Sequence, residues 1–123
     1  MAERLHQVGH AGEETAERHL AQMGYRILAR NFRCRFGEID LIAREGQTLV
    51  FIEVKTRRSR AFGPASLAVT NGKQRRLIKA SQVYLSQRGG AQEVCRFDVV
   101  TIQIEAGVSQ VEVIKNAFQH ENV

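Results

Sequence analysis

The sequence predicts an α/β domain in which helices pack on a mixed β-sheet, with elements in the order α-β-β-β-α-β-β. Two segments carry apolar residues at helical spacing, and the segments around them have the patterns of strands. The length of 123 residues is typical of one domain, and no stretch has the composition of a linker. We therefore expect one domain over residues 1–123, with 116–123 as a loosely held tail.

The first helix is predicted from about Leu5 to Met23, and Gly24 supplies a stop. Glu13 lies inside the apolar stripe of this helix. A carboxylate on a packing face is costly unless something pairs with it, so Glu13 is a candidate site residue. The stripe itself consists of Gly9, Ala16, Leu20 and Met23.

Three strands are predicted after this helix. A strand-like pattern extends from Tyr25 to Phe36. A β-hairpin follows, with arms from Glu38 to Arg44 and from Thr48 to Lys55 joined around Glu45-Gly46-Gln47.

The second helix is predicted from about Thr70 or Asn71 to Arg88, and Gly89-Gly90 ends it. Val94 to Ile104 is apolar on both faces and is therefore expected to be a central strand. Val111 to Ile114 is expected to form a shorter strand. The apolar stripe of the second helix is Leu77, Ile78, Ser81, Tyr84 and Leu85.

Composition and charge narrow the class of protein. The chain is 43% hydrophobic and 25% charged, which excludes collagen, low-complexity disorder and a membrane-spanning protein. Lys and Arg total 18 against 13 Asp and Glu, so the net charge is +5 at pH 7. A basic domain of this size favours polyanionic partners such as nucleic acid.

The cysteines and the first residues indicate a compartment. Cys34 and Cys95 lie far apart without metal-ligand spacing, as expected of reduced thiols in a cytoplasmic protein. The chain starts without the apolar stretch of a secretory signal. We therefore expect a cytoplasmic location and no membrane partner.

Charged side chains recur on one face of the predicted hairpin. Because side chains alternate between faces, Glu38 shares a face with Asp40, and Glu53 shares a face with Lys55. A two-residue loop at Gly46-Gln47 would place Asp40 opposite Glu53, with Cβ atoms about 5 Å apart, and Glu38 opposite Lys55. Three carboxylates and a lysine would then converge on one patch of the sheet.

Adjacent carboxylates repel each other, and burial increases that cost. A hard divalent cation such as Mg²⁺ or Mn²⁺ offsets the repulsion, because it takes oxygen ligands. We expect Asp40, Glu53 and Glu13 to hold this ion, and Lys55 to assist the attacking water. The alternative is a salt-bridge ladder, in which Glu38 and Asp40 pair with Lys55 and nearby arginines on a solvated sheet face.

Ordered motifs extend over most of the chain, from about Gly12 to Ile102. They are Gly12-Glu13 with Ala16, Tyr25 and Asn31, Gly37-Glu38-Ile39-Asp40-Leu41-Ile42, Phe51-Ile52-Glu53-Val54-Lys55-Thr56-Arg57, Phe62-Gly63-Pro64, Lys73 and Arg96-Phe97-Asp98-Val99-Val100. Together they resemble the YraN-like family of small bacterial proteins. That resemblance implies a restriction-endonuclease-like core, related to archaeal Holliday junction resolvases, with a PD-(D/E)xK-type site.

The resemblance also implies residue roles and an activity. Asp40 is similar to the metal-binding aspartate of the superfamily, and Glu53 and Lys55 are similar to its Glu-x-Lys pair. Glu13 resembles the helix-borne acid of the resolvase branch. Gly37-Glu38-Ile39 stands where many members have a proline before the aspartate. The implied activity is Mg²⁺-dependent hydrolysis of DNA phosphodiester bonds, on branched or otherwise structured DNA.

Two basic clusters are predicted to contact the DNA backbone. Arg57, Arg58 and Arg60 follow the Glu-x-Lys strand, so DNA whose phosphate reaches the metal passes beside them. Lys73 and Arg76 lie on one side of the second helix. The alternative for both clusters is an ordinary solvated surface.

Three classes of function remain open from the sequence. The first is a metal-dependent endonuclease, and the second is a noncatalytic nucleic-acid-binding module that retains the nuclease fold. The third is a structural or partner-binding domain whose acidic residues are surface decoration. A homodimer is also open, with the second helix or Phe118 as the contact.

Overall fold

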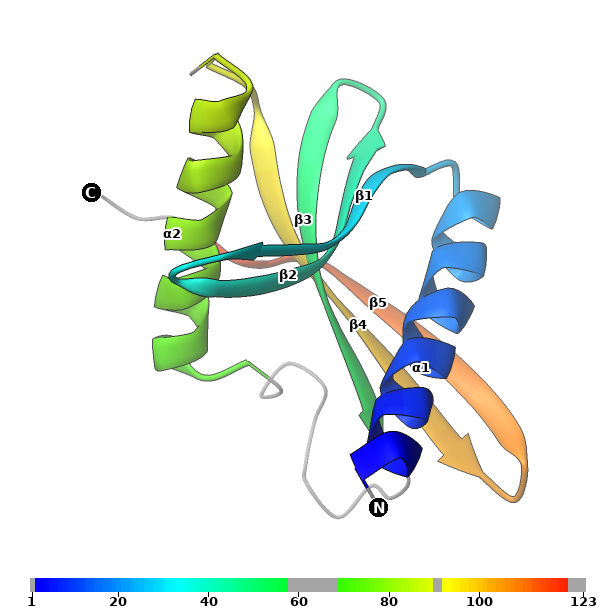
Figure 1. Cartoon of the computed structure of the whole chain (residues 1–123). Coiled ribbons are helices and arrows are strands. Elements are labelled where there is room, and N and C mark those ends of the chain that lie inside the picture. Colours follow the sequence, from blue (N-terminus) through cyan, green and yellow to red (C-terminus); the bar gives the residue numbers. More distant parts are fainter. Residues whose placement is uncertain (1, 58–68, 90–91, 120–123) are drawn as a thin grey trace.

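The structure, a computed structural model, describes residues 2–57, 69–89 and 92–119, with side chains described from residue 11 onward (Figure 1). The elements follow each other in the predicted order. They are α1 (Ala2–Gln22), β1 (Arg26–Cys34), β2 (Gly37–Glu45), β3 (Thr48–Arg57), α2 (Asn71–Gln87), β4 (Cys95–Glu105) and β5 (Val108–Phe118).

The strands form one mixed sheet in the order β1-β2-β3-β4-β5. β3 and β4 are parallel, and the other neighbouring pairs are antiparallel. β4 lies between β3 and β5, so the prediction of a central strand is confirmed. Figure 1 shows the two helices on opposite sides of this sheet.

α1 packs on one face of the sheet. Ala16 and Leu20 are fully buried against apolar side chains of β2, β3 and β4, among them Ile52 and Val100. Burial of apolar surface stabilises the fold by about 25 cal/mol per Å². Because these contacts fix the middle of α1 on the sheet, the preceding turn of the helix, which carries Glu13, lies over the strands.

α2 packs on the opposite face through a series of aromatic contacts. The ring of Tyr84 meets Phe32 at 5.3 Å and Phe51 at 5.9 Å between centroids, both edge to face. Phe51 stacks on Phe97 at 5.6 Å, and Phe97 stacks on Phe118 at 4.8 Å. These rings connect α2 with β1, β3, β4 and β5, and so set where its first turn lies relative to β3.

Two predictions about the ends of elements are wrong. Met23 is 40% exposed rather than buried, because α1 ends at Gln22 and the chain turns at Gly24 with φ 98°. β5 extends to Phe118, so 116–118 belong to the sheet and not to the expected loose tail. The strand is extended because its last residues contact β4: Phe118 stacks on Phe97, and Asn116 N donates to Asp98. Residues 120–123 lie outside the described residues.

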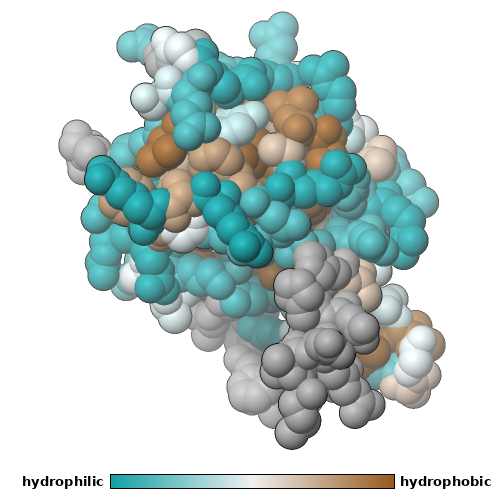
Figure 2. All heavy atoms as spheres, in the orientation of Figure 1, coloured by the Kyte–Doolittle hydropathy of each residue, from teal (hydrophilic) through white to brown (hydrophobic). Residues whose placement is uncertain are grey.

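The contact of Phe118 also bears on the proposed dimer. Its ring stacks on Phe97 and stays half-buried, so a contact between copies at Phe118 stays a prediction. Apolar residues are also visible at the tip of the β4–β5 hairpin, at the lower right of Figure 2, where Val108 is 62% exposed. Cys34 and Cys95 are both free thiols, as expected. Within the part of the chain that the structure describes, no helix combines the length and apolarity that crossing a membrane requires.

Candidate functional site

The register between β2 and β3 is the one that the sequence predicts. Glu45 pairs with Thr48 across the two-residue loop, and the pairing continues to Leu41 and Ile52. Beyond that pair the two strands separate, and the Asp40 carboxylate enters the gap, where Oδ2 accepts the N–H of Val54 at 2.8 Å. β2 meanwhile continues alongside β1. The site is therefore built where one strand pair opens.

Three carboxylates meet at this opening. Glu13 comes from α1, and Glu38 and Asp40 come from β2; one oxygen of each lies within 4.8 Å of the others. We call these three residues the acid cluster. All three are half-buried. Three hard oxygen donors at such spacing suit a cation such as Mg²⁺ or Mn²⁺, and their mutual repulsion favours binding one.

Asn31 links two members of the acid cluster. With its amide oriented to suit its neighbours, the nitrogen lies 3.0 Å from Glu13 Oε2 and 2.7 Å from Glu38 Oε1. Asn31 adopts φ 52°, a left-handed conformation that asparagine tolerates better than most residues. One amide thus holds a helix carboxylate beside a strand carboxylate.

Glu13 reaches the sheet because α1 approaches β3 closely. A Cβ placed on Gly12 would overlap Thr56 Oγ1 and would lie 3.7 Å from Ile102 Cδ1. A side chain at this point of the helix therefore requires either another rotamer of Thr56 or a shift of α1 away from β3, and Glu13 would move with the helix.

The environment of Asp40 disfavours its charge. Burial, and then the nearby carboxylate of Glu53, raise the pKa of Asp40 to about 7, against an opposing contribution from the N–H of Val54. Glu13 and Glu38 raise the pKa further. The alternative of a salt-bridge ladder fits Glu38, whose Oε2 lies 3.5 Å from Arg33 Nε, better than Asp40, whose carboxylate accepts the N–H of Val54.

Glu53 lies beside the acid cluster and is paired with lysines. It is 4% exposed, its Oε1 lies 2.6 Å from Lys73 Nζ, and Lys55 Nζ lies 3.7 Å from the same oxygen. Burial, together with the neighbouring Lys73 ammonium, lowers the pKa of Lys55. Burial also acts against the charge of Lys73, but the hydrogen bond to Glu53 outweighs it and the pKa of Lys73 is raised.

The first turn of α2 positions Lys73. Thr70 precedes the helix in an extended conformation, and its side chain accepts the N–H of Lys73 at 3.2 Å. Such an N-cap stabilises the start of a helix by about 1 kcal/mol. Lys73 therefore leaves a well-defined helical turn and reaches across to β3.

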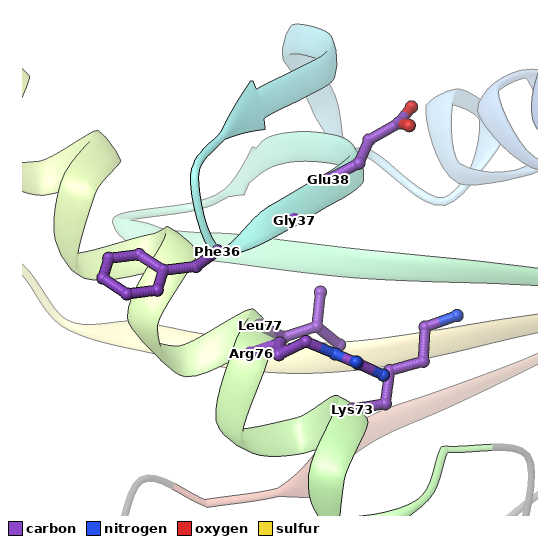
Figure 3. A pocket seen from close by; sticks show the side chains of 6 residues that line it. All are labelled: Phe36, Gly37, Glu38, Lys73, Arg76 and Leu77. Carbon is purple, nitrogen blue, oxygen red and sulfur yellow. The ribbon is translucent and has the colours of Figure 1, made fainter.

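A cavity of about 60 Å³ adjoins the acid cluster between the β1–β2 turn and α2. Glu38 lies at one end of it and Phe36 at the other (Figure 3). The charged ends of Lys73 and Arg76 extend from α2 away from the Phe36 ring. One carboxylate and two cations therefore border the same small space. The lining residues are Phe36, Gly37, Glu38, Lys73, Arg76 and Leu77.

The structure brings the predicted residues together but arranges them differently. Glu13 and Asp40 belong to the acid cluster, where Glu38 takes the place expected for Glu53. Glu53 and Lys55 are neighbours on β3, as the strand alternation predicts, but the nearest cation to Glu53 is Lys73.

Two residue contacts and one role were missed from the sequence. Glu38 was predicted to lie on the same face as Asp40, but it was not assigned to the set that holds the ion, where the structure places it. Asn31 is among the residues that carry the family resemblance, but nothing in its neighbours points to a bridging amide. The pairing of Lys73 with Glu53 depends on how α2 docks, for which no local signal exists.

The predicted DNA contacts are only partly described. Arg57 is half-buried at the end of β3, and Arg58 and Arg60 lie outside the described residues. Arg76 is exposed and borders the cavity next to Glu38. Lys73, which we expected to contact a backbone phosphate, forms an ion pair with Glu53.

Comparison with known proteins gives consistent matches over nearly the whole chain. The model of the uncharacterised protein family UPF0102 matches residues 12–102. A UPF0102 protein of Symbiobacterium thermophilum is 51% identical over 112 residues, covering 90% of this chain and 95% of its own. One of Geobacter metallireducens is 47% identical over 112 residues, covering 91% and 92%. One of Pelobacter propionicus is 50% identical over 114 residues, covering 90% and 81%.

Proposed function

The chain belongs to the uncharacterised protein family UPF0102, which confirms the resemblance to YraN-like proteins, and we propose that it is a divalent-metal-dependent DNA endonuclease with a restriction-endonuclease-like core. One observation carries the proposal. Carboxylates from α1, β2 and β3 gather where β2 and β3 separate, and two lysines stand beside them. The resemblance of the Glu-x-Lys strand supports it.

The acid cluster fits a resident Mg²⁺ or Mn²⁺. Its donors are all carboxylate oxygens, and burial followed by the charges of Glu53, Glu13 and Glu38 raises the pKa of Asp40, so a bound cation would stabilise the ionised form of this carboxyl. When bound, such an ion polarises a phosphoryl group and acidifies a bound water. Glu53 borders this set and is the fourth carboxylate that a cation at the cluster would attract.

Lys55 is the residue that we assign to the attacking water. Its amine lies on the half-buried part of β3 that follows Glu53, and partial burial together with Lys73 increases its neutral fraction by lowering its pKa. A neutral Nζ accepts a proton from the water, and the resulting ammonium then offsets charge on the phosphate. Glu53 and Lys73 position this amine, since both lie within ion-pair or hydrogen-bonding range of it.

Arg76 and Arg57 are the described residues that we assign to backbone phosphates. Arg76 is exposed at the cavity next to Glu38, and Arg57 follows Lys55 on β3. Contacts of this kind give affinity without sequence preference and weaken as salt is raised. Arg58 and Arg60 continue the same basic segment of the sequence.

The test is cleavage of end-labelled linear, flapped and four-way DNA with Mg²⁺ or Mn²⁺ and with a chelator. We expect metal-dependent nicking by the wild-type protein, reduced at least about a hundredfold by Asp40→Asn, Glu53→Gln or Lys55→Ala, with DNA affinity largely retained. Glu112→Gln is the matched control, because this carboxylate is exposed on β5 and pairs across from Thr101, away from the acid cluster.

Each result has a defined meaning. Nicking that is equal in wild-type and Asp40→Asn preparations would identify a contaminant and contradict the proposal. Salt-sensitive binding of junction DNA without cleavage by any divalent ion would favour a noncatalytic binding module. A protein that neither binds nor cuts DNA would favour a structural domain.

A further inference from the structure

Phe36 is an unusual residue for its position, because a phenylalanine is not what a two-residue β-turn favours. Arg35 and Phe36 are the two turn residues between Cys34 and Gly37, which pair at the ends of β1 and β2. Two-residue turns favour Gly, Asn and Asp, because these residues tolerate the required backbone angles. Among the described residues, Phe36 is also absent from both apolar clusters of the core. A large ring is thus held, half-buried, at the tip of a hairpin.

Cations surround this ring. The guanidinium of Arg35 lies 4.7 Å from its centroid, and Lys79 Nζ of α2 lies 5.5 Å from it. Phe36 borders the 60 Å³ cavity that contains Arg76 and Glu38, and also an open groove of about 460 Å³ along α2. The ring therefore stands between two hollows with positive charge on each side. Aromatic rings interleaved with cations are typical of surfaces that bind single-stranded nucleic acid.

The ring is also near the acid cluster. Phe36 and Glu38 are two residues apart in the chain, and both line the 60 Å³ cavity. Figure 3 shows the Phe36 ring and the Glu38 carboxylate pointing in different directions, with the carboxylate directed away from α2. A DNA strand with one phosphate at the acid cluster would therefore pass along this cavity and bring a nearby base within reach of Phe36.

We propose that Phe36 is a stacking platform for an unpaired nucleobase, so that the substrate class is DNA with an unpaired nucleotide next to the cleaved bond. The inference rests on the proposed function and specifies its substrate. A base inside an intact duplex already stacks on both neighbours and has no free face. An unpaired base at a flap, bulge or branch point has a free face. It can stack on Phe36 while Lys79 and Arg76 bind the flanking phosphates.

The test compares two DNAs that differ by one nucleotide. Fluorescence anisotropy measures binding of an end-labelled duplex and of the same duplex with a single unpaired base, without divalent cation so that no strand is cut. We expect Phe36→Leu to weaken binding of the bulged DNA by about 5- to 100-fold and binding of the paired duplex by less than about twofold. Phe36→Trp keeps an aromatic face and should retain the preference.

Val108→Ala is the matched apolar control, since Val108 is exposed on the β4–β5 hairpin. An equal loss for both DNAs in Phe36→Leu, or no loss for either, overturns the inference, as does a wild-type protein without preference for the bulge. A changed oligomeric state in Phe36→Leu, with the bulge preference intact, assigns the ring to a contact between copies and also overturns it.

The two proposals fail separately. Absence of cleavage with Mn²⁺, alongside a bulge preference that depends on Phe36, contradicts the endonuclease and leaves base stacking intact. Cleavage of DNA at equal rates by wild type and Phe36→Leu on bulged and paired substrates supports the endonuclease and refutes the platform.

Discussion

Lys73, at the start of α2, forms an ion pair with Glu53 of β3, with Nζ 2.6 Å from Oε1. Among the residues whose burial is described, Glu53 and Asp98 are the buried charged ones, and Glu53 faces α2 from the strand that also carries Lys55. The pair therefore joins the helix to the candidate site. It also offsets the negative charge of Glu53, whose nearness helps to raise the pKa of Asp40.

Removing Lys73 should destabilise the protein. Lys73→Met leaves Glu53 buried with only Lys55 nearby, at 3.7 Å, and we expect a loss of about 1–3 kcal/mol in the free energy of unfolding. Lys73→Met/Glu53→Gln should recover much of the loss, because the buried charge is then absent. Urea unfolding measures both. Arg75→Met is the control, since Arg75 is exposed on the same turn. Unchanged stability with weaker DNA binding would instead make Lys73 a surface phosphate contact.

Stability should fall with rising pH through the carboxyl of Asp40. Its pKa rises from 3.8 to about 7 on folding, so between these values the folded state keeps a proton that the unfolded chain has lost. This contribution is complete below pH 3.8 and is lost as pH rises through 7.

Asp40→Asn should remove that dependence. Without divalent cation, we expect the variant to gain on the order of 2 kcal/mol over wild type between pH 5 and pH 8. Chemical unfolding at both pH values measures the difference. Parallel curves for the two proteins would show that Asp40 titrates normally in the folded state.

Asn31 should strengthen metal binding without touching the metal. Its amide holds Glu13 beside Glu38, and loss of such an orienting partner typically weakens metal affinity by about 10- to 100-fold. Asn31→Gly removes the amide but tolerates φ 52°. Calorimetric titration with Mn²⁺ measures the effect. Asn116→Gly is the matched control, because Asn116 has φ 55° on β5. Equal Mn²⁺ affinities in all three proteins would refute the role.

Gly12→Ala should be destabilising although alanine favours helices. Helix propensity predicts a gain of about 1 kcal/mol, but the added Cβ overlaps Thr56 Oγ1. We expect the steric cost of this overlap to exceed the gain in helix propensity. The free energy of unfolding and the Mn²⁺ affinity should then both decrease, because Glu13 moves with the helix. Gly12→Ala/Thr56→Ala should restore both. Gly72→Ala is the control, since the space around Gly72 is open and alanine should be neutral or stabilising there. A stabilised Gly12→Ala would show that Thr56 simply adopts another rotamer.

Local patterns determined the elements and one register. Apolar spacing placed both helices and the strands, because side chains repeat about every 3.6 residues on a helix and every 2 on a strand. The two-residue loop at Gly46-Gln47 then set the pairing of β2 with β3, which the structure confirms from Glu45 to Leu41. It follows that Asp40, Glu53 and Lys55 were recognisable as neighbours from the sequence.

Which carboxylates share a centre depends on long-range packing. At Asp40, β2 stops pairing with β3 and continues to pair with β1. α1 lies close to the sheet at Gly12, which brings the carboxylate of Glu13 near that of Glu38. The distances between these carboxylates depend on how a helix packs against a pair of strands that is distant from it in the sequence. The aromatic packing of α2 on the sheet likewise positions Lys73 within ion-pair distance of Glu53. Periodicity specifies which face a side chain occupies, whereas the gap between two faces is set by how all the layers pack together.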